Sequence, residues 1–133
     1  MLAGSKRFHE ILAELGSLHG KKQQDYGTDA DPFANIRAGE EWGIRPWVNA
    51  MSRATDKVRR IQRYAERGHL ANESVEDSFR DLAVHTIIAL VLWEEVRDSL
   101  DEGIRRGLRA VHEGRIRPAH DVFQSLVKTL ECR

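Results

Sequence analysis

The chain has 133 residues, and its 21 basic and 21 acidic side chains leave a formal net charge of zero. Such a length suits one domain with a hydrophobic core of its own. Balanced charge argues against a protein that holds nucleic acid by bulk electrostatics, so no nucleic-acid partner is expected. The single cysteine, Cys132, excludes an internal disulfide and a cysteine-type zinc site, and favours a cytoplasmic protein. No apolar run approaches the roughly 20 residues of a membrane helix, and the N-terminus lacks the pattern of a secretory signal.

Helical periodicity dominates the chain, and no strand-like alternation stands out. Apolar residues at helical spacing predict a first helix over residues 5–24. A long connection over 25–45 follows, with room for a short helix over 32–42. Long connections that carry aromatic residues are more often functional than idle.

Two further helices can be placed from their end signals. Pro46 suits the first turn of a helix and Gly68 suits the residue after its end, so a helix is predicted between them. The next helix is expected to start near Asn72, a good N-cap, and to run to about Asp101. Its middle is apolar nearly all round, as in the central helix of a bundle.

The last third of the chain carries two more amphipathic segments, one ending at His112 and one beginning at Pro118. The whole chain is therefore predicted to be one all-α domain, a helical bundle of four main helices with an additional C-terminal helix. It carries more apolar helix faces than one small bundle covers. A homo-oligomer is expected for that reason.

Acidic residues recur every four positions along the predicted central helix. This spacing places four side chains on one helix face: Glu73, Asp77, Asp81 and His85. Like charges with this spacing repel one another, and Asp81 shares its helix face with residues expected in the core, where an unpaired charge is unfavourable. A bound cation would neutralise the carboxylates. Carboxylate oxygens with room for water suit Mg²⁺ or Mn²⁺, and Glu76 is a spare ligand. The alternative is ordinary acidic decoration of a helix N-terminus, which explains Glu73 and Glu76 better than Asp81.

The preceding helix carries a polar stripe that includes Asp56, Lys57 and Arg60. Taken alone, the stripe is better explained as a solvated face. As a site, Asp56 would add a metal ligand while Lys57 and Arg60 would hold phosphate oxygens.

A third polar string spans the end of the first predicted helix and contains Lys21, Lys22, Asp25, Tyr26 and Gly27. It is either a polar turn ended by Gly27 or a nucleotide clamp. In a clamp, Tyr26 would stack on a base and a lysine would hold phosphate.

Taken in order, the strings at residues 22–27, 56–61 and 73–81 resemble one family. It is a phage-type branch of the MazG-like all-α nucleoside triphosphate pyrophosphohydrolases, associated with nucleotide modification. The resemblance covers residues 8–95. It implies a helical bundle, a dimer or tetramer, that binds Mg²⁺ through helix carboxylates. The implied reaction is hydrolysis of a nucleoside triphosphate to the monophosphate and pyrophosphate.

The resemblance implies a catalytic core over residues 1–97 and a helical extension over 98–133. The expected metal ligands are Asp56, Glu73, Asp77 and Asp81. Two catalytic residues are expected, one to orient the attacking water and one to neutralise charge on the phosphate: Glu76 and Lys57. The expected substrate-binding residues are Lys21, Lys22, Asp25, Tyr26 and Arg60.

The chain departs from the better-known MazG enzymes, which carry Glu-x-x-Glu on one helix and Glu-x-x-Asp on the next. Here the first pair is missing, and the second becomes Asp77-x-x-x-Asp81. The competing hypothesis is therefore a non-enzymatic nucleotide-binding or oligomeric helical module, in which the acidic residues are structural.

Overall fold

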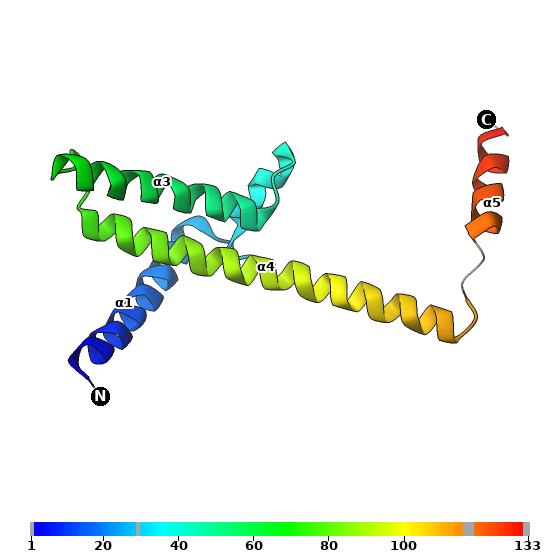
Figure 1. The fold of residues 1–133 in the computed structure, drawn as a ribbon, viewed down its shortest axis with the longest axis horizontal. Coiled ribbons are helices and arrows are strands. Elements are labelled where there is room, and N and C mark those ends of the chain that lie inside the picture. Colours follow the sequence, from blue (N-terminus) through cyan, green and yellow to red (C-terminus); the bar gives the residue numbers. More distant parts are fainter. Residues whose placement is uncertain (1, 29, 116–118, 132–133) are drawn as a thin grey trace. The chain divides into compact units, whose positions relative to one another are not determined.

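A computed structural model describes residues 2–28, 30–115 and 119–131 (Figure 1). These residues form five α-helices and one 3₁₀ helix, and the described chain contains no strand, so the all-α prediction is confirmed. The chain divides into two compact units, one up to Glu94 and one from Glu95 onward. No helix among the described residues is long and apolar enough to cross a membrane.

The first helix, α1 (Ala3–Tyr26), extends two residues beyond the predicted range of 5–24 at each end. It ends where the Gly27 N–H donates to the Gln23 carbonyl at 2.9 Å. A Cβ on Gly27 would come within 2.8 Å of that carbonyl oxygen and 3.0 Å of the Pro32 Cα. Only glycine lets the two backbone segments pass this closely.

The predicted short helix in the connection is present as α2 (Ala34–Arg37) followed by η1 (Ala38–Trp42). Asp31 organises the approach to α2, because its carboxylate accepts the backbone N–H two residues later at 2.9 Å. The Asn49 amide donates to the Ile36 carbonyl at 2.8 Å and so ties α2 to the next long helix.

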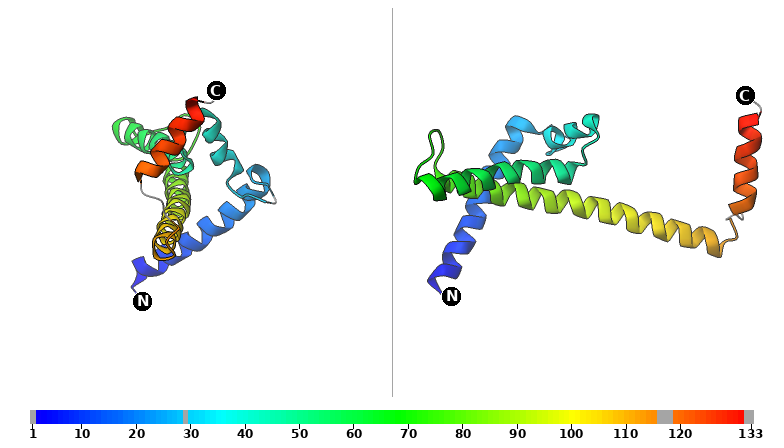
Figure 2. Two further views of the ribbon diagram at one scale, coloured as in Figure 1. Left: turned by 90° about the vertical axis from the view of Figure 1, so that its right-hand side faces the viewer. Right: turned by 45° about the horizontal axis from the view of Figure 1, so that its top comes forward.

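Helix α3 (Pro46–Arg67) has the predicted ends. Gly68 follows it with a φ of 77°, in the left-handed region that favours glycine. Figures 1 and 2 show α3 running antiparallel and side by side with the first part of α4.

Helix α4 (Val75–His112) begins three residues later than the predicted start at Asn72. The hydroxyl of Ser74 accepts the N–H of Asp77 at 3.1 Å, so Ser74 supplies the capping bond in place of Asn72.

The two segments predicted to end at Asp101 and His112 are one continuous helix, so the predicted break is wrong. Gly103 and Gly107 lie inside it. Interior glycine costs about 1 kcal/mol but leaves the hydrogen-bond ladder intact, so it weakens a helix without ending it. The last helix is α5 (Ala119–Glu131), and its predicted first residue, Pro118, lies outside the described residues.

The core of the first unit lies where α2, α3 and α4 meet. Its buried members are Ile36, Ala50, Ile88, Ala89 and Leu92. Phe33, Trp47 and Val84 pack against this cluster, and the Trp47 ring meets the Trp93 ring edge-on at 5.6 Å. The core thus holds together the helices that also carry the polar residues described next.

Candidate functional site

A cavity of about 500 Å³ lies in the first unit, bordered by α1, α2 with the residues before it, α3 and α4. Its apolar lining includes Phe33, Ile36 and Ile88. The charged residues that line it are Lys22, Arg53, Asp56, Lys57, Arg60 and Asp81. Four cations face two carboxylates there, which leaves an excess of positive charge. Small-molecule sites have this size and this mixture of apolar walls with a few polar groups.

Asp81 on α4 is the electrostatic centre of the cavity. Its Oδ2 lies 2.8 Å from the Lys57 Nζ on α3, and its Oδ1 lies 3.1 Å from the Lys22 Nζ on α1. The side chains of Asp81 and Lys57 are only 17% and 16% exposed. Both carboxylate oxygens are therefore paired with lysines, and these two contacts tie three helices together.

The surroundings of Asp81 act on its pKa in opposite directions. Partial burial by itself raises the pKa of the carboxyl, because it disfavours the charged form. Hydrogen bonds and positive charge from Lys57 and Lys22 outweigh burial, so the pKa lies below its ordinary value. Asp81 is therefore ionised at neutral pH.

Two histidines also line the cavity. The Nδ1 of His85 lies 2.7 Å from the Asp81 carbonyl oxygen, which can only accept. In the neutral ring Nδ1 therefore carries the proton, and Nε2 is left as an acceptor. His19 stacks on Phe33 with ring centroids 5.8 Å apart, giving the cavity an aromatic wall.

His19 and Phe33 are not among the site residues predicted from the sequence. A signal was present for His19, which stands three residues before Lys22 and so shares its face of α1. For Phe33 the signal was general, since it is one of the aromatic residues of the long connection, and its place in the cavity depends on the path of that connection between two helices.

Five of the predicted site residues line the cavity together: Lys22, Asp56, Lys57, Arg60 and Asp81. Of the clamp string, Lys22 and its neighbour Gln23 do so. Lys21 and Asp25 are exposed and do not line the cavity, and the side chain of Tyr26 lies outside the described residues.

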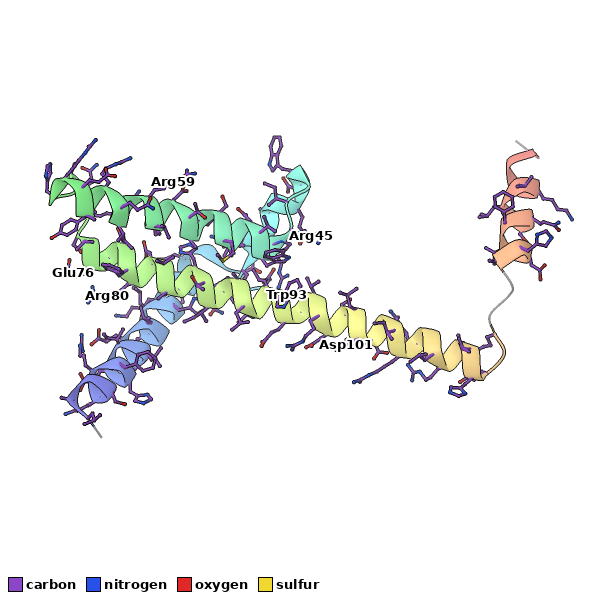
Figure 3. The ribbon with its side chains drawn as sticks, in the orientation of Figure 1. Arg45, Arg59, Glu76, Arg80, Trp93 and Asp101 are labelled. Atoms are coloured by element: carbon purple, nitrogen blue, oxygen red, sulfur yellow. The ribbon has the colours of Figure 1, made fainter. Side chains whose placement is uncertain are left out.

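The remaining acidic residues lie elsewhere. Glu73 precedes α4 and is ion-paired with Arg60. Asp77 is 59% exposed and lies 3.6 Å from the Arg80 guanidinium. Glu76 and Arg80 border a separate, mainly apolar groove against α1, and Figure 3 shows both on the side of α4 toward α1. The structure thus does not bring the four expected metal ligands together.

Two carboxylates line the cavity and are the residues that would hold a metal there, Asp56 and Asp81. Among the described residues, no group of three or more His, Cys, Asp or Glu side chains could hold one by itself. Mg²⁺ is commonly held by one or two carboxylates together with substrate phosphates. In the structure both oxygens of Asp81 are paired with lysines, so a metal there would take the place of these cations.

One cavity of the first unit thus combines an excess of positive charge, an aromatic wall and a histidine nitrogen that can accept a hydrogen bond. Comparisons with protein-family models, with curated proteins and with solved structures found no match for this chain. The likeness to MazG-like enzymes therefore rests on the three sequence strings, and the function has to be argued from the chemistry of the cavity.

Proposed function

We propose that the cavity binds a nucleoside triphosphate and that the protein hydrolyses it to the monophosphate and pyrophosphate, with Mg²⁺ or Mn²⁺. One observation carries this proposal. Lys22, Lys57 and Asp81 come from the three different strings of the family resemblance, and Lys22 and Asp81 stand 59 positions apart. In the structure both lysines form ion pairs with the carboxylate of Asp81.

The cations account for phosphate binding. Lys22 and Lys57 share the single carboxylate of Asp81. Arg60 is paired with Glu73, and Arg53 adds a further positive charge to the lining. A triphosphate would compete with Asp81 for the lysines and would draw on the charge excess. Guanidinium groups suit such a ligand because they can bond two phosphate oxygens at once.

The aromatic wall suits the base. The side chain of Tyr26, which is predicted to stack on the base, lies outside the described residues, and the described aromatic pair that borders the cavity is His19 with Phe33. Stacking on an aromatic face accepts every base, so this wall would contribute affinity with little selectivity.

The water-positioning role moves from Glu76 to His85. Glu76 borders a different groove, whereas His85 offers an acceptor nitrogen in the cavity. His85 would take a proton from the attacking water, and Lys57 would stabilise charge that grows on the phosphate. A metal held by Asp56, Asp81 and substrate phosphates would supply Lewis-acid polarisation of the phosphate.

Product analysis tests the reaction. The protein is incubated with each dNTP and NTP in Mg²⁺, and inorganic phosphate is measured with and without added pyrophosphatase. Phosphate that forms only with pyrophosphatase is the expected result. Lys57→Met should abolish it, whereas Arg59→Met on the outer side of α3 should not, because Arg59 does not line the cavity.

Other outcomes of this experiment point elsewhere. Phosphate without pyrophosphatase would identify a phosphatase. No product, together with a nucleotide-dependent rise in melting temperature, would identify the non-enzymatic binding module. The pairing of both Asp81 oxygens with lysines is the observation that favours this second candidate.

We also propose that the protein is a homo-oligomer, a dimer or tetramer, that its main helices form a four-helix bundle, and that it is cytoplasmic. The supporting observation is an apolar stripe on the part of α4 in the second unit. Its members are 52–61% exposed: Leu100, Ile104, Leu108 and Val111. Light scattering at micromolar concentration should give a multiple of 15.2 kDa, and a mass of 15.2 kDa would contradict the proposal.

A further inference from the structure

A second cavity, of about 250 Å³, lies at the C-terminal end of α3. One wall is formed by three arginines of that helix, Arg60, Arg63 and Arg67. The other wall is the connection to α4 over residues 69–73. Neither Arg63 nor Arg67 belongs to the predicted site residues, and the proposed reaction uses neither of them.

The charge of this cavity is not balanced by its own lining. The three arginines stand at i, i+3 and i+7 and so share one helix face, where like charges repel. Glu73 is the carboxylate of the lining, and it is ion-paired with Arg60. Within the described residues no ion pair engages the side chain of Arg63 or Arg67.

The helix end does not explain the cluster. A cation in the last turn is favoured by the helix dipole, which accounts for Arg67. The same dipole places partial negative charge at this end, so any bound anion depends on the guanidinium groups for its attraction. Three guanidinium groups around one small cavity provide that attraction, with two of them open to a ligand.

Arg60 lines both cavities, so they adjoin along α3. From Arg53 to Arg67 the cations recur at intervals of three or four residues. At about 1.5 Å per residue, this row is about 21 Å long. Such a row can meet phosphate groups that lie well apart on one extended ligand.

We propose that the second cavity is a phosphate-binding site, in which Arg63 and Arg67 bind the anion and Glu73 competes with it for Arg60. The anion is either a free phosphate compound or one phosphate of an oligonucleotide that continues from the first cavity. The proposal does not depend on hydrolysis in the first cavity.

Binding of tripolyphosphate, followed by calorimetry at low salt, tests the site in the full-length protein. Wild type should bind at two sites per chain. Arg63→Gln/Arg67→Gln should retain one site and weaken the other at least tenfold. Arg45→Gln/Arg59→Gln removes the same charge from residues that line neither cavity, and it should retain both sites. All four arginines are exposed, and circular dichroism would verify that both variants fold.

Glu73→Gln should strengthen binding of the phosphate probe, whereas the arginine substitutions should weaken it. Glu73→Gln removes the carboxylate that competes for Arg60, so it should tighten the second site several-fold. A metal ligand at this position would not produce that gain.

A labelled ten-nucleotide oligothymidylate distinguishes the two sources of phosphate. If it binds wild type and loses at least tenfold in affinity in Arg63→Gln/Arg67→Gln, the anion is a backbone phosphate. If tripolyphosphate alone shows the loss, the anion is a free phosphate compound. Equal binding of both probes to wild type and Arg63→Gln/Arg67→Gln would overturn the proposal, whatever the result of the hydrolysis assay.

Discussion

Replacing Asp81 with asparagine tests the electrostatic centre of the cavity most directly. The substitution preserves the size of the side chain but leaves Lys22 and Lys57 without their shared carboxylate. Exposed ion pairs contribute about 0–1 kcal/mol, and breaking a buried pair costs about 3–5 kcal/mol. Because Asp81 and Lys57 are about one-sixth exposed while Lys22 is about half exposed, we expect a loss of about 2–3 kcal/mol in the free energy of unfolding.

Thermal unfolding measures this loss. For a chain of this size, 1 kcal/mol corresponds to about 4 °C, so the melting temperature of Asp81→Asn should fall by about 10 °C. Asp56→Asn is the matched control, since it removes a carboxylate of the same cavity. Its partner Arg59 is 3.8 Å away and both side chains are largely exposed, so its loss should stay below about 1 kcal/mol.

The pH dependence of this stability loss shows whether the ion pairs of Asp81 cause it. Since the folded pKa of Asp81 is lowered, its contribution is fully present above the ordinary value of 3.8 and is lost as the pH falls through the folded pKa. The difference between wild type and Asp81→Asn should therefore be constant between pH 7 and pH 5 and should shrink below about pH 4. Equal melting temperatures at pH 7, or a difference that persists unchanged at pH 3, would refute the ion-pair argument.

Three further substitutions test local features of the fold, each by denaturant unfolding. Ser74→Ala removes the hydroxyl that accepts the Asp77 N–H and should cost about 1 kcal/mol; an unchanged midpoint would exclude a capping role. Gly68→Ala places a side chain at a φ of 77° and should cost about 1–2 kcal/mol, whereas a gain would show that α3 ends differently. Asn49→Ala removes the donor to the Ile36 carbonyl and should cost about 1–3 kcal/mol; a loss below 0.5 kcal/mol would show that the contact between α2 and α3 is dispensable.

Helix ends marked by proline and glycine are readable from the sequence because these signals act within a few residues. Pro46 and Gly68 predict both ends of α3 correctly for this reason. The start of α4 is less determined, since Asn72 and Ser74 are both good caps. The choice between them depends on the path of the connection from α3.

The candidate site also has one part that the sequence predicts and one part that it does not. The sequence identifies Lys22, Lys57 and Asp81 as chemically interesting, but it assigns the carboxylates to one metal because their spacing places them on one helix face. In the structure Glu73 lies before the helix begins, and Asp81 is paired with lysines from two other helices.

Sequence periodicity thus determined that the chain is helical and which residues share a face of each helix, because both follow from a repeat of 3.6 residues. It could not determine which faces meet, because contacts between helices depend on side-chain packing and on the paths of the connections. Tertiary structure alone decided that Asp81 lies between two lysines, that His19 and Phe33 form a wall, and that Arg60 borders two cavities.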